Sequence, residues 1–252
     1  MKVRLLLGLV VAMVVAVGIW PAPAGADPFK GPPICSSAGV AVSGSHGNLT
    51  IRGNAYVPGH KTLRVRGNLW VAPGACLDAF TKGTVKVAGN VVVGKGAVLA
   101  LGCTPQSIGP VPPCGNTTTK DVVGGSILAD RPLTMYLDGD TIGGNVISNG
   151  GGPGLHGTFL NFPVKDNTIG GNLVIQGWRG GWVGSIRNTV AGNVVFSNNK
   201  SVADPDSNEV QTNDISGNLV CRGNSPATHV NPDDGGLPNT VAGRKIAQCA
   251  KL

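Results

Sequence analysis

The amino-acid sequence predicts an all-β protein: a single right-handed parallel β-helix, or β-solenoid, with inserted loops, preceded by a cleaved signal peptide. Three observations support this prediction. A Gly-Asn phrase recurs at intervals of about one solenoid coil, apolar residues alternate on both sides of it, and an uncharged apolar stretch opens the chain. We therefore expect residues 1–26 to be the signal peptide and residues 27–252 to form one β-solenoid domain with disulfide-stapled loops.

The opening segment has the order of a secretory signal. Lys2 and Arg4 precede the uncharged run 5–19, and Ala24-Gly25-Ala26 supplies the small residues that a signal peptidase reads. The alternative is a membrane anchor, but this run is shorter than the roughly 20 residues that a bilayer span needs. We predict cleavage after Ala26, secretion of the mature chain, and no stable membrane span after cleavage.

Composition excludes several classes of protein. The chain has 40 glycines but only 13% charged residues, and its glycines keep no three-residue period, so it is neither disordered nor collagenous. Loss of Lys2 and Arg4 with the signal would lower the net charge from +7 to +5. The remaining basic residues are dispersed, without a nucleic-acid-binding motif. Weak association with anionic wall polymers is one interpretation; a solvated surface is the simpler one.

Six cysteines follow the signal, and an even number in an exported chain favours disulfides. Six cysteines allow 15 pairings. Proximity along the chain suggests Cys103–Cys114 and Cys221–Cys249, and elimination then leaves Cys35–Cys76. A zinc site is the weaker alternative, because there is no CxxC and the four histidines lack ligand spacing. We expect no metal and no cofactor.

Internal repetition is the most informative feature. The phrase Asn-Thr-Ile-Gly-Gly-Asn-Leu at 167–173 recurs, with small changes, at 140–146, 188–194 and 213–219, and a degenerate copy spans 239–245. Looser copies precede it, and the second Asn of the phrase stands at Asn48, Asn68, Asn90, Asn145, Asn172, Asn193 and Asn218. These positions are 20 to 27 residues apart except for one gap of 55, which would hold a worn copy at Gly125-Ser126.

Each copy has a physical interpretation. Ile169, Leu173 and Ile175 alternate as in a strand with one buried face. Gly-Asn tolerates positive φ, so we expect it to turn a corner of the coil, and stacked Asn side chains to form a hydrogen-bonded ladder. Gly-Asn is also a hairpin signal, which leaves an antiparallel sandwich as the alternative. The intervals exceed sandwich turn spacing, and the flanking residues recur, which favours stacked coils.

The phrase Asn-Thr-[Ile/Val]-x-Gly-Asn-[Leu/Val], together with 217–221 and 236–243, resembles exported actinobacterial β-solenoid proteins of unknown function. The resemblance covers most of the chain after the signal. It implies location and architecture, and it brings no catalytic residues.

One Gly-rich segment holds the best candidate binding site: Trp178, Arg179, Trp182 and Arg187. Exposed indoles stack on sugar rings, and Arg pairs with uronate or phosphate. The alternative is that both indoles pack on the coil.

Two acidic groups of residues are further candidate sites. Asp138 and Asp140 would share one face of a strand, as acid–base pairs do in polysaccharide-cleaving β-helices, but Asp140 takes the place of a repeat Asn, which favours a turn residue. Asp204, Asp206 and Asn208 begin like a calcium loop and then depart from its pattern at Glu209 and Ile215.

No nucleophile elbow, HExxH or P-loop occurs. The sequence therefore predicts an exported, non-enzymatic structural or interaction protein of the cell envelope or medium. The alternatives are a carbohydrate-binding β-helix module and a polysaccharide lyase-like or hydrolase-like enzyme. Expected partners are extracellular glycans or anionic wall polymers, and not nucleic acid. A Thr recurring once per unit, at 141, 168, 189 and 240, is a weak ice-binding signal. Oligomeric state and ligand stay open.

Overall fold

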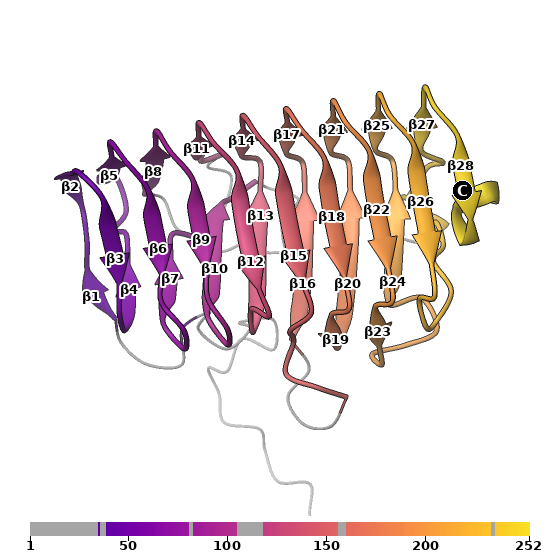
Figure 1. The fold of residues 1–252 in the computed structure, drawn as a ribbon, viewed down its shortest axis with the longest axis horizontal. Coiled ribbons are helices and arrows are strands. Elements are labelled where there is room, and N and C mark those ends of the chain that lie inside the picture. The colour runs from indigo at the N-terminus through magenta and orange to yellow at the C-terminus, as the bar shows by residue number, and fades with distance from the viewer. Residues whose placement is uncertain (1–34, 36–38, 81–82, 105–117, 156–159, 233–234) are drawn as a thin grey trace, which may run out of the picture. The chain divides into compact units, whose positions relative to one another are not determined.

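The computed structural model describes residue 35 and residues 39–80, 83–104, 118–155, 160–232 and 235–252. Within them the chain forms a β-solenoid of about eight turns with parallel strands stacked in three sheets (Figure 1). The predicted signal peptide at 1–26 lies outside the described residues. All ladders between the strands are parallel, which removes the antiparallel sandwich.

Each coil contributes one strand to each sheet. Sheet A contains β1 (Val40–Ala41), β4 (Asn54–Tyr56), β7 (Cys76–Asp78), β10 (Val98–Gly102), β13 (Thr134–Asp138), β16 (Asn161–Lys165), β20 (Trp182–Ile186) and β24 (Asn208–Gln211). Sheet B contains β2 (Gly44–His46), β5 (Thr62–Val65), β8 (Thr84–Val87), β11 (Val122–Val123), β14 (Thr141–Ile142), β17 (Thr168–Ile169), β21 (Thr189–Val190), β25 (Asp214–Ile215) and β27 (Thr240–Val241).

Sheet C contains β3 (Leu49–Ile51), β6 (Leu69–Val71), β9 (Val91–Val93), β12 (Ile127–Asp130), β15 (Val146–Asn149), β18 (Leu173–Gln176), β22 (Val194–Ser197), β26 (Leu219–Arg222) and β28 (Lys245–Ala247). Two short strands, β19 (Arg179–Gly180) and β23 (Lys200–Ser201), pair in the turns between sheets C and A, and the 3₁₀ helix η2 (Gln248–Lys251) ends the chain. In Figure 1, sheet A rises at the back, sheet B crosses the top and sheet C descends at the front. The coil advances from left to right, which makes it right-handed.

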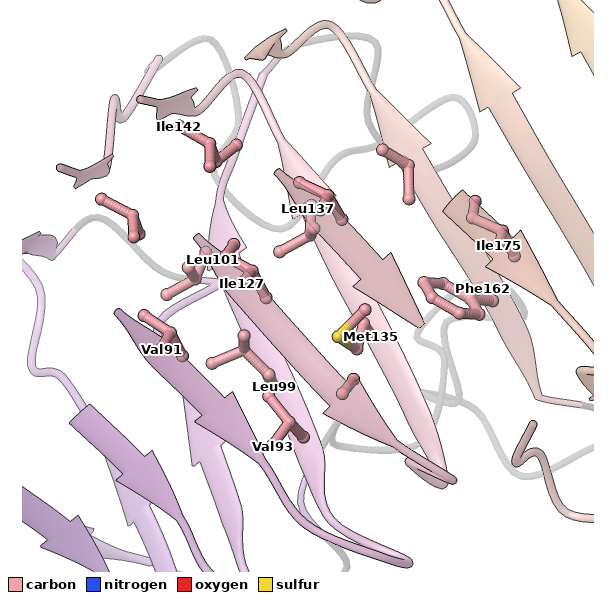
Figure 2. Close-up of a cluster of buried hydrophobic side chains, with 14 of the residues drawn as sticks. Val91, Val93, Leu99, Leu101, Ile127, Met135, Leu137, Ile142, Phe162 and Ile175 are labelled. Atoms are coloured by element: carbon pink, nitrogen blue, oxygen red, sulfur yellow. The ribbon is translucent and has the colours of Figure 1, made fainter. Parts of the chain in front are cut away.

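The core lies inside the coil and consists of stacked aliphatic side chains. Ile169, Leu173 and Ile175, whose alternation predicted inward orientation, are all buried. The equivalent residues of neighbouring coils stack on them, so the core is a set of columns along the solenoid axis (Figure 2). Because each strand pairs with the equivalent strand about 4.8 Å away, a column stays apolar only when every coil keeps its register.

The predicted Asn ladder is present at the corner between sheets B and C. The backbone N–H of each corner Asn donates to the side-chain Oδ1 of the Asn one coil earlier, at 2.8 Å for both Asn172 to Asn145 and Asn193 to Asn172. Ser126 fills the predicted gap, because its N–H donates to Asn90 Oδ1 and its Oγ accepts the N–H of Asn145. The ladder joins, in order, Asn48, Asn68, Asn90, Ser126, Asn145, Asn172, Asn193, Asn218 and the backbone of Arg244.

The expectation that the glycines of this phrase are needed for positive φ is wrong. Gly171, like its equivalents in the other copies, is absent from the residues with positive φ. The glycine is required by close approach: a Cβ on Gly171 would overlap Asn145 Oδ1 and lie 2.9 Å from the carbonyl carbon of Gly144. The phrase also joins two sides of the coil, because the strand before it belongs to sheet B and the strand after it to sheet C.

Substitution of Gly171 with alanine is expected to lower the free energy of unfolding by about 1–3 kcal/mol, because the added methyl group displaces the Asn145 side chain from the ladder. Gly47 is the matched control. It holds the same place in the first copy, and a Cβ there would meet nothing within 4 Å. Urea unfolding of both variants measures the difference, and equal losses would contradict the steric explanation.

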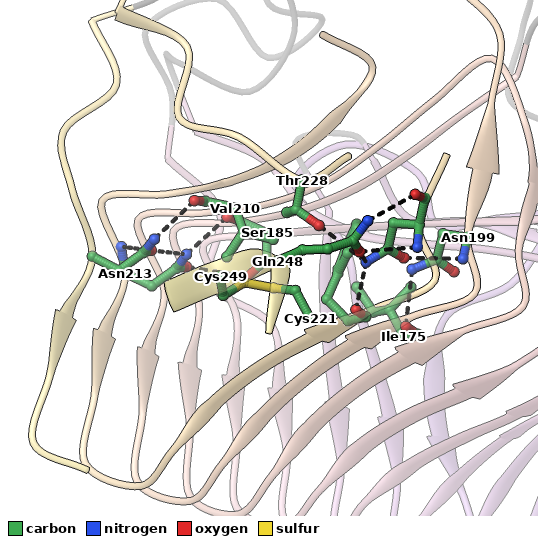
Figure 3. Close-up of a disulfide and its surroundings, with 12 residues drawn as sticks. Ile175, Ser185, Asn199, Val210, Asn213, Cys221, Thr228, Gln248 and Cys249 are labelled. Atoms are coloured by element: carbon green, nitrogen blue, oxygen red, sulfur yellow. Dashed lines mark hydrogen bonds between the residues drawn. A yellow bond between two sulfur atoms is a disulfide. The ribbon is translucent and has the colours of Figure 1, made fainter. Parts of the chain in front are cut away.

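Two further ladders of Asn lie inside the coil. Asn167, Asn188, Asn213 and Asn239, the first residues of successive phrases, are 1–4% exposed, and each donates its Nδ2 to a sheet A carbonyl of the preceding coil. Asn199 and Asn224 do the same beneath sheet C, with Nδ2 of Asn199 on the carbonyl of Ile175 (Figure 3). These amides satisfy buried backbone groups at the bends, where strand pairing stops.

Two of the three proposed disulfides are present. Cys35–Cys76 lies near the N-terminal end and Cys221–Cys249 near the C-terminal end, with Cα–Cα distances of 5.7 and 5.1 Å. Cys103 is also disulfide-bonded; Cys114, its proposed partner, lies outside the described residues. Cys249 is on η2 and Cys221 on β26, so the second bridge fixes the terminal helix across the last coil (Figure 3).

Replacing both Cys221 and Cys249 with serine is expected to cost about 2–4 kcal/mol, because the bridge closes a loop between residues 28 apart. The loss should concentrate at the open end of the stack. We expect the rate of hydrogen exchange to rise much more in β28 and η2 than in β15 and β18. Uniform acceleration along all coils would contradict a local capping role.

Candidate functional site

The structure does not bring the four residues of the Trp–Arg candidate site together. Trp178 is fully buried in the core, edge-on to Phe162 with ring centroids 6.0 Å apart. Its backbone N–H donates to Asn199 Oδ1 at 3.0 Å, which holds the turn against the inner ladder. The expectation of an exposed, sugar-stacking Trp178 is therefore wrong: the indole is large and apolar enough to fill the coil where sheet C turns toward sheet A.

The other three residues occupy two separate places. Trp182 begins β20 on sheet A, partly exposed, with Lys165 Nζ 4.9 Å from the ring centroid. Arg187 follows β20 and forms a two-pronged ion pair with Asp166, at 2.6 and 2.7 Å, which raises the pKa of its guanidinium. Arg179 lies on β19, in the turn between sheets C and A, and is exposed. Glycan binding by these three residues stays a prediction.

The acidic pair of Asp138 and Asp140 is buried. Asp138 ends β13 and Asp140 precedes β14, and each is 1% exposed. Asp121, fully buried, joins them from the preceding coil, with Oδ1 accepting from Val85 N–H at 2.7 Å and Oδ2 from Gly102 N–H at 3.0 Å. Carboxylates that solvent and a polymer cannot reach do not line a catalytic groove, so this geometry gives the enzyme alternative no support.

Burial dominates the protonation of these acids. It raises the pKa of Asp121 to about 7. It raises the pKa of Asp140 well above the usual value, and the negative charges of Asp121 and Asp138 add to this effect. Neither Asp140 oxygen makes a hydrogen bond of standard geometry with the described residues. Asp140 holds the ladder place that is Asn in later copies, with its N–H donating to Asn167 Oδ1 at 2.9 Å.

Sequence reasoning missed Asp121, although a signal was available. Residues 121–126 read Asp-Val-Val-Gly-Gly-Ser, a worn copy of the Asn-Thr-Ile-Gly-Gly-Asn phrase, with Asp121 in the place of the first Asn. Aligning the copies would therefore have assigned it to the inner ladder.

The proposed calcium loop does not gather its ligands. Asp204 and Asp206 lie in an exposed turn, where Asp204 Oδ1 accepts the N–H of Asp206 at 2.9 Å. Asn208 is fully buried on β24, and its Nδ2 donates to the carbonyl of Pro226. Among the described residues no group of three or more potential metal ligands converges.

The most distinctive surface is the outer face of sheet C. The central residues of its nine strands face outward and stand in register, so that they form one column along the solenoid. Eight of the nine are large and apolar. We call this column the apolar stripe, and it comprises Thr50, Trp70, Val92, Leu128, Ile147, Val174, Val195, Val220 and Ile246.

The stripe is accessible along its length. Trp70, Val92 and Leu128 are 38–40% exposed, and the remaining members are partly exposed. Sheet C forms the front of Figure 1, and no described segment crosses it. With about 4.8 Å between strands, nine strands extend the stripe over about 38 Å. Scattered surface apolar residues need no explanation, but a contiguous patch of this kind marks an interaction site.

The outer face of sheet B provides an internal comparison. Its equivalent column is mostly polar: Ser45, Arg64, Lys86, Val122, Thr141, Thr168, Thr189, Asp214 and Thr240. Both columns lie on strands of the same coils, and both need residues that suit a pleated strand. β propensity therefore explains the β-branched side chains of the stripe but not their lack of hydroxyl groups.

A row of cations borders the stripe at the edge where sheet C turns toward sheet A. We call it the cationic edge: Arg52, Lys95, Arg131, Arg179, Lys200 and Arg222, all exposed. Arg222 lies two residues after Val220 and so shares its face of the strand. Arg179 and Lys200 are direct neighbours in the β19–β23 pair. On this edge Asp130 pairs with Arg131 at 2.9 Å, and Asp204 and Asp206 lie farther on, toward sheet A.

The chain was compared with protein-family models, with curated proteins and with solved structures, and none of the three comparisons gave a match. In the part of the chain that the structure describes, no helix has both the length and the apolar character needed to cross a bilayer. The function is therefore inferred from the outer face of sheet C.

Proposed function

We propose that this chain is an exported, non-catalytic interaction protein of the cell envelope or the surrounding medium. The observation that carries the proposal is the unbroken apolar stripe on an uncovered sheet. The solenoid makes that surface rigid, because every coil is tied to the next by strand pairing and by Asn ladders. A flat, stiff face about 38 Å long suits an extended partner better than a small ligand.

Export is supported by chemistry from two parts of the chain. Disulfides near both ends of the solenoid are typical of a protein that folds in an oxidising compartment. The charged, apolar and small-residue segments of 1–26 have the order of a cleavable signal. The intact mass of the protein recovered from the medium or the envelope tests this part, and we expect a chain that begins at Asp27. A product that keeps Met1 would contradict it.

Binding without turnover is tested on isolated envelope fractions of the organism that encodes the chain. We expect the mature protein to be retained by the envelope and to release no carbohydrate from it. The appearance of new reducing ends or unsaturated uronates would overturn the proposal and restore the lyase or hydrolase alternative.

A further inference from the structure

We propose that the outer face of sheet C is a docking surface for an anionic lipid membrane, on which the solenoid lies with its long axis parallel to the surface. This inference rests on the proposed function, since it names the partner of the same face. It follows from two features that run side by side along the solenoid: the apolar stripe and the cationic edge.

The stripe requires an apolar partner. Aliphatic side chains such as Val174, Val195 and Val220 offer no hydrogen bonds, and their contribution to binding comes from removing their surface from water. Sugar rings are recognised mainly by aromatic faces and polar groups, and the stripe has one aromatic residue, Trp70. The acyl region of a bilayer meets this requirement over the full length of the column, and Trp is itself favoured at the membrane interface.

The cationic edge requires a partner with negative charge. Arg179 and Lys200 are adjacent on paired strands, and Arg222 occupies the next coil of the same edge. Neighbouring like charges repel, and an array of anionic headgroups relieves that repulsion. Long Lys and Arg side chains also extend toward headgroups while their alkyl stems stay near apolar surface. An apolar face bordered by cations is the pattern of interfacial binding to anionic lipid.

Charge argues against a second copy as the partner. In a twofold face-to-face dimer whose axis runs along the strands, the cationic edge of one protomer would lie against that of the other. If the axis ran along the solenoid, the cationic edge would lie against the corner ladder, which contains no acidic residue. The described acids near this edge are Asp130, already paired with Arg131, and Asp204 and Asp206, which lie toward sheet A. Like charges across an interface oppose association, so self-association through this face becomes an outcome of the test.

The test measures sedimentation of the mature, disulfide-bonded protein with vesicles of phosphatidylglycerol and phosphatidylcholine, and with pure phosphatidylcholine vesicles. We expect binding to the anionic vesicles alone, weakening as salt is raised. Val92→Thr on the stripe has a matched control in Val122→Thr on sheet B, because the two valines are 39% and 38% exposed. The double change Val174→Thr/Val195→Thr removes two neighbouring apolar side chains from the stripe and is a second stripe variant.

The cations have a matched pair as well. Lys200→Gln/Arg222→Gln removes two charges from the cationic edge, and Arg64→Gln/Lys86→Gln removes two neighbouring charges from sheet B. We expect the affinity of the edge variant for anionic vesicles to fall by about tenfold or more, and the sheet B variant to bind like the unchanged protein. Circular dichroism and Tm of all variants exclude misfolding as the cause.

Three results would overturn the inference. One is no binding to anionic vesicles, and a second is equal loss in the sheet C and sheet B variants. The third is a dimer, seen by light scattering, that the stripe substitutions dissociate, since this would assign the face to a second copy. None of them touches the proposed function, which fails separately if the protein releases carbohydrate products.

Discussion

Replacing Asn188 with alanine is expected to lower the free energy of unfolding by about 3–5 kcal/mol, the largest effect of any single change considered. Its Nδ2 donates to the carbonyl of Val164 at 2.8 Å and to Asn213 Oδ1 at 3.0 Å. Its Oδ1 accepts from the backbone N–H and from the side-chain Nδ2 of Asn167. All these groups are buried. Truncation removes the side-chain partner of the backbone N–H of Asn167 and of the Val164 carbonyl, while Asn213 Oδ1 and Asn167 Nδ2 keep other partners. Each buried group left without a partner costs about 1–3 kcal/mol.

The control for this variant is Asn193→Ala on the corner ladder. Asn193 accepts from Asn218 in the same way, at 2.8 Å, but it is partly exposed, so water can replace the lost bonds. We expect a loss of about 1 kcal/mol there. Chemical denaturation of both variants gives the comparison. Similar losses of unfolding free energy at the two positions would show that the inner ladder stabilises the fold no more than the corner ladder does.

Replacing Asp140 with asparagine is expected to stabilise the protein, by about 1–3 kcal/mol at pH 8. At this pH the folded protein either carries a charge on a carboxyl that is buried without a well-formed hydrogen bond, beside Asp121 and Asp138, or keeps that carboxyl protonated. Both states cost free energy relative to the unfolded chain, in which the group ionises freely. The introduced amide carries no charge and matches the later copies, in which the Asn side chain donates to a carbonyl and to the next Asn. Relieving an unsatisfied buried group accounts for the magnitude.

The same change should flatten the dependence of stability on pH. A raised carboxyl pKa means that the folded state holds its proton more tightly than the unfolded state. The contribution of such a group is fully present below the unfolded pKa and is lost as pH rises through the folded pKa. For Asp121 that interval runs from 3.8 to about 7, and for Asp140 it extends upward from the same starting value. We therefore expect the unchanged protein to lose stability as pH rises from about 4.

Denaturation midpoints between pH 4 and 9 test this expectation. The gain from Asp140→Asn should be small at pH 4 and should grow as pH rises, while Asp214→Asn, on the exposed face of sheet B, serves as the control. A gain that is constant with pH would mean that shape, and not charge, explains the effect.

Much of the architecture could be predicted from the repeat alone. The recurrence of Asn145, Asn172, Asn193 and Asn218 indicated stacked coils with an Asn ladder, and the long interval correctly indicated a worn copy at Ser126. The reason for Gly171 could not be read in the same way. Positive φ and close approach both select glycine, and only the distance to Asn145 in the neighbouring coil separates them.

The site was harder to predict because it depends on register. Alternation within one strand shows that Val174 faces outward, but not that Val195, Leu128 and Trp70 share its column. The intervals between these residues vary, so the stripe emerges only when the strands are paired. The prediction that Trp178 is exposed was wrong for a related reason. Nothing in its Gly-rich surroundings distinguishes an indole that fills the inside of the coil from one that lies on its outer surface. The resemblance to actinobacterial solenoids stays a prediction.

The central claim, that the outer face of sheet C is the working surface, is tested most directly by the fluorescence of Trp70. This residue lies on the stripe and is 40% exposed, whereas Trp178 is buried and Trp182 lies on sheet A. With anionic vesicles that carry bromine on the upper acyl chain, we expect strong quenching of the unchanged mature protein. We expect little quenching of Trp70→Phe at equal binding. Equal quenching of the two proteins, or no quenching when both are bound, would contradict the claim.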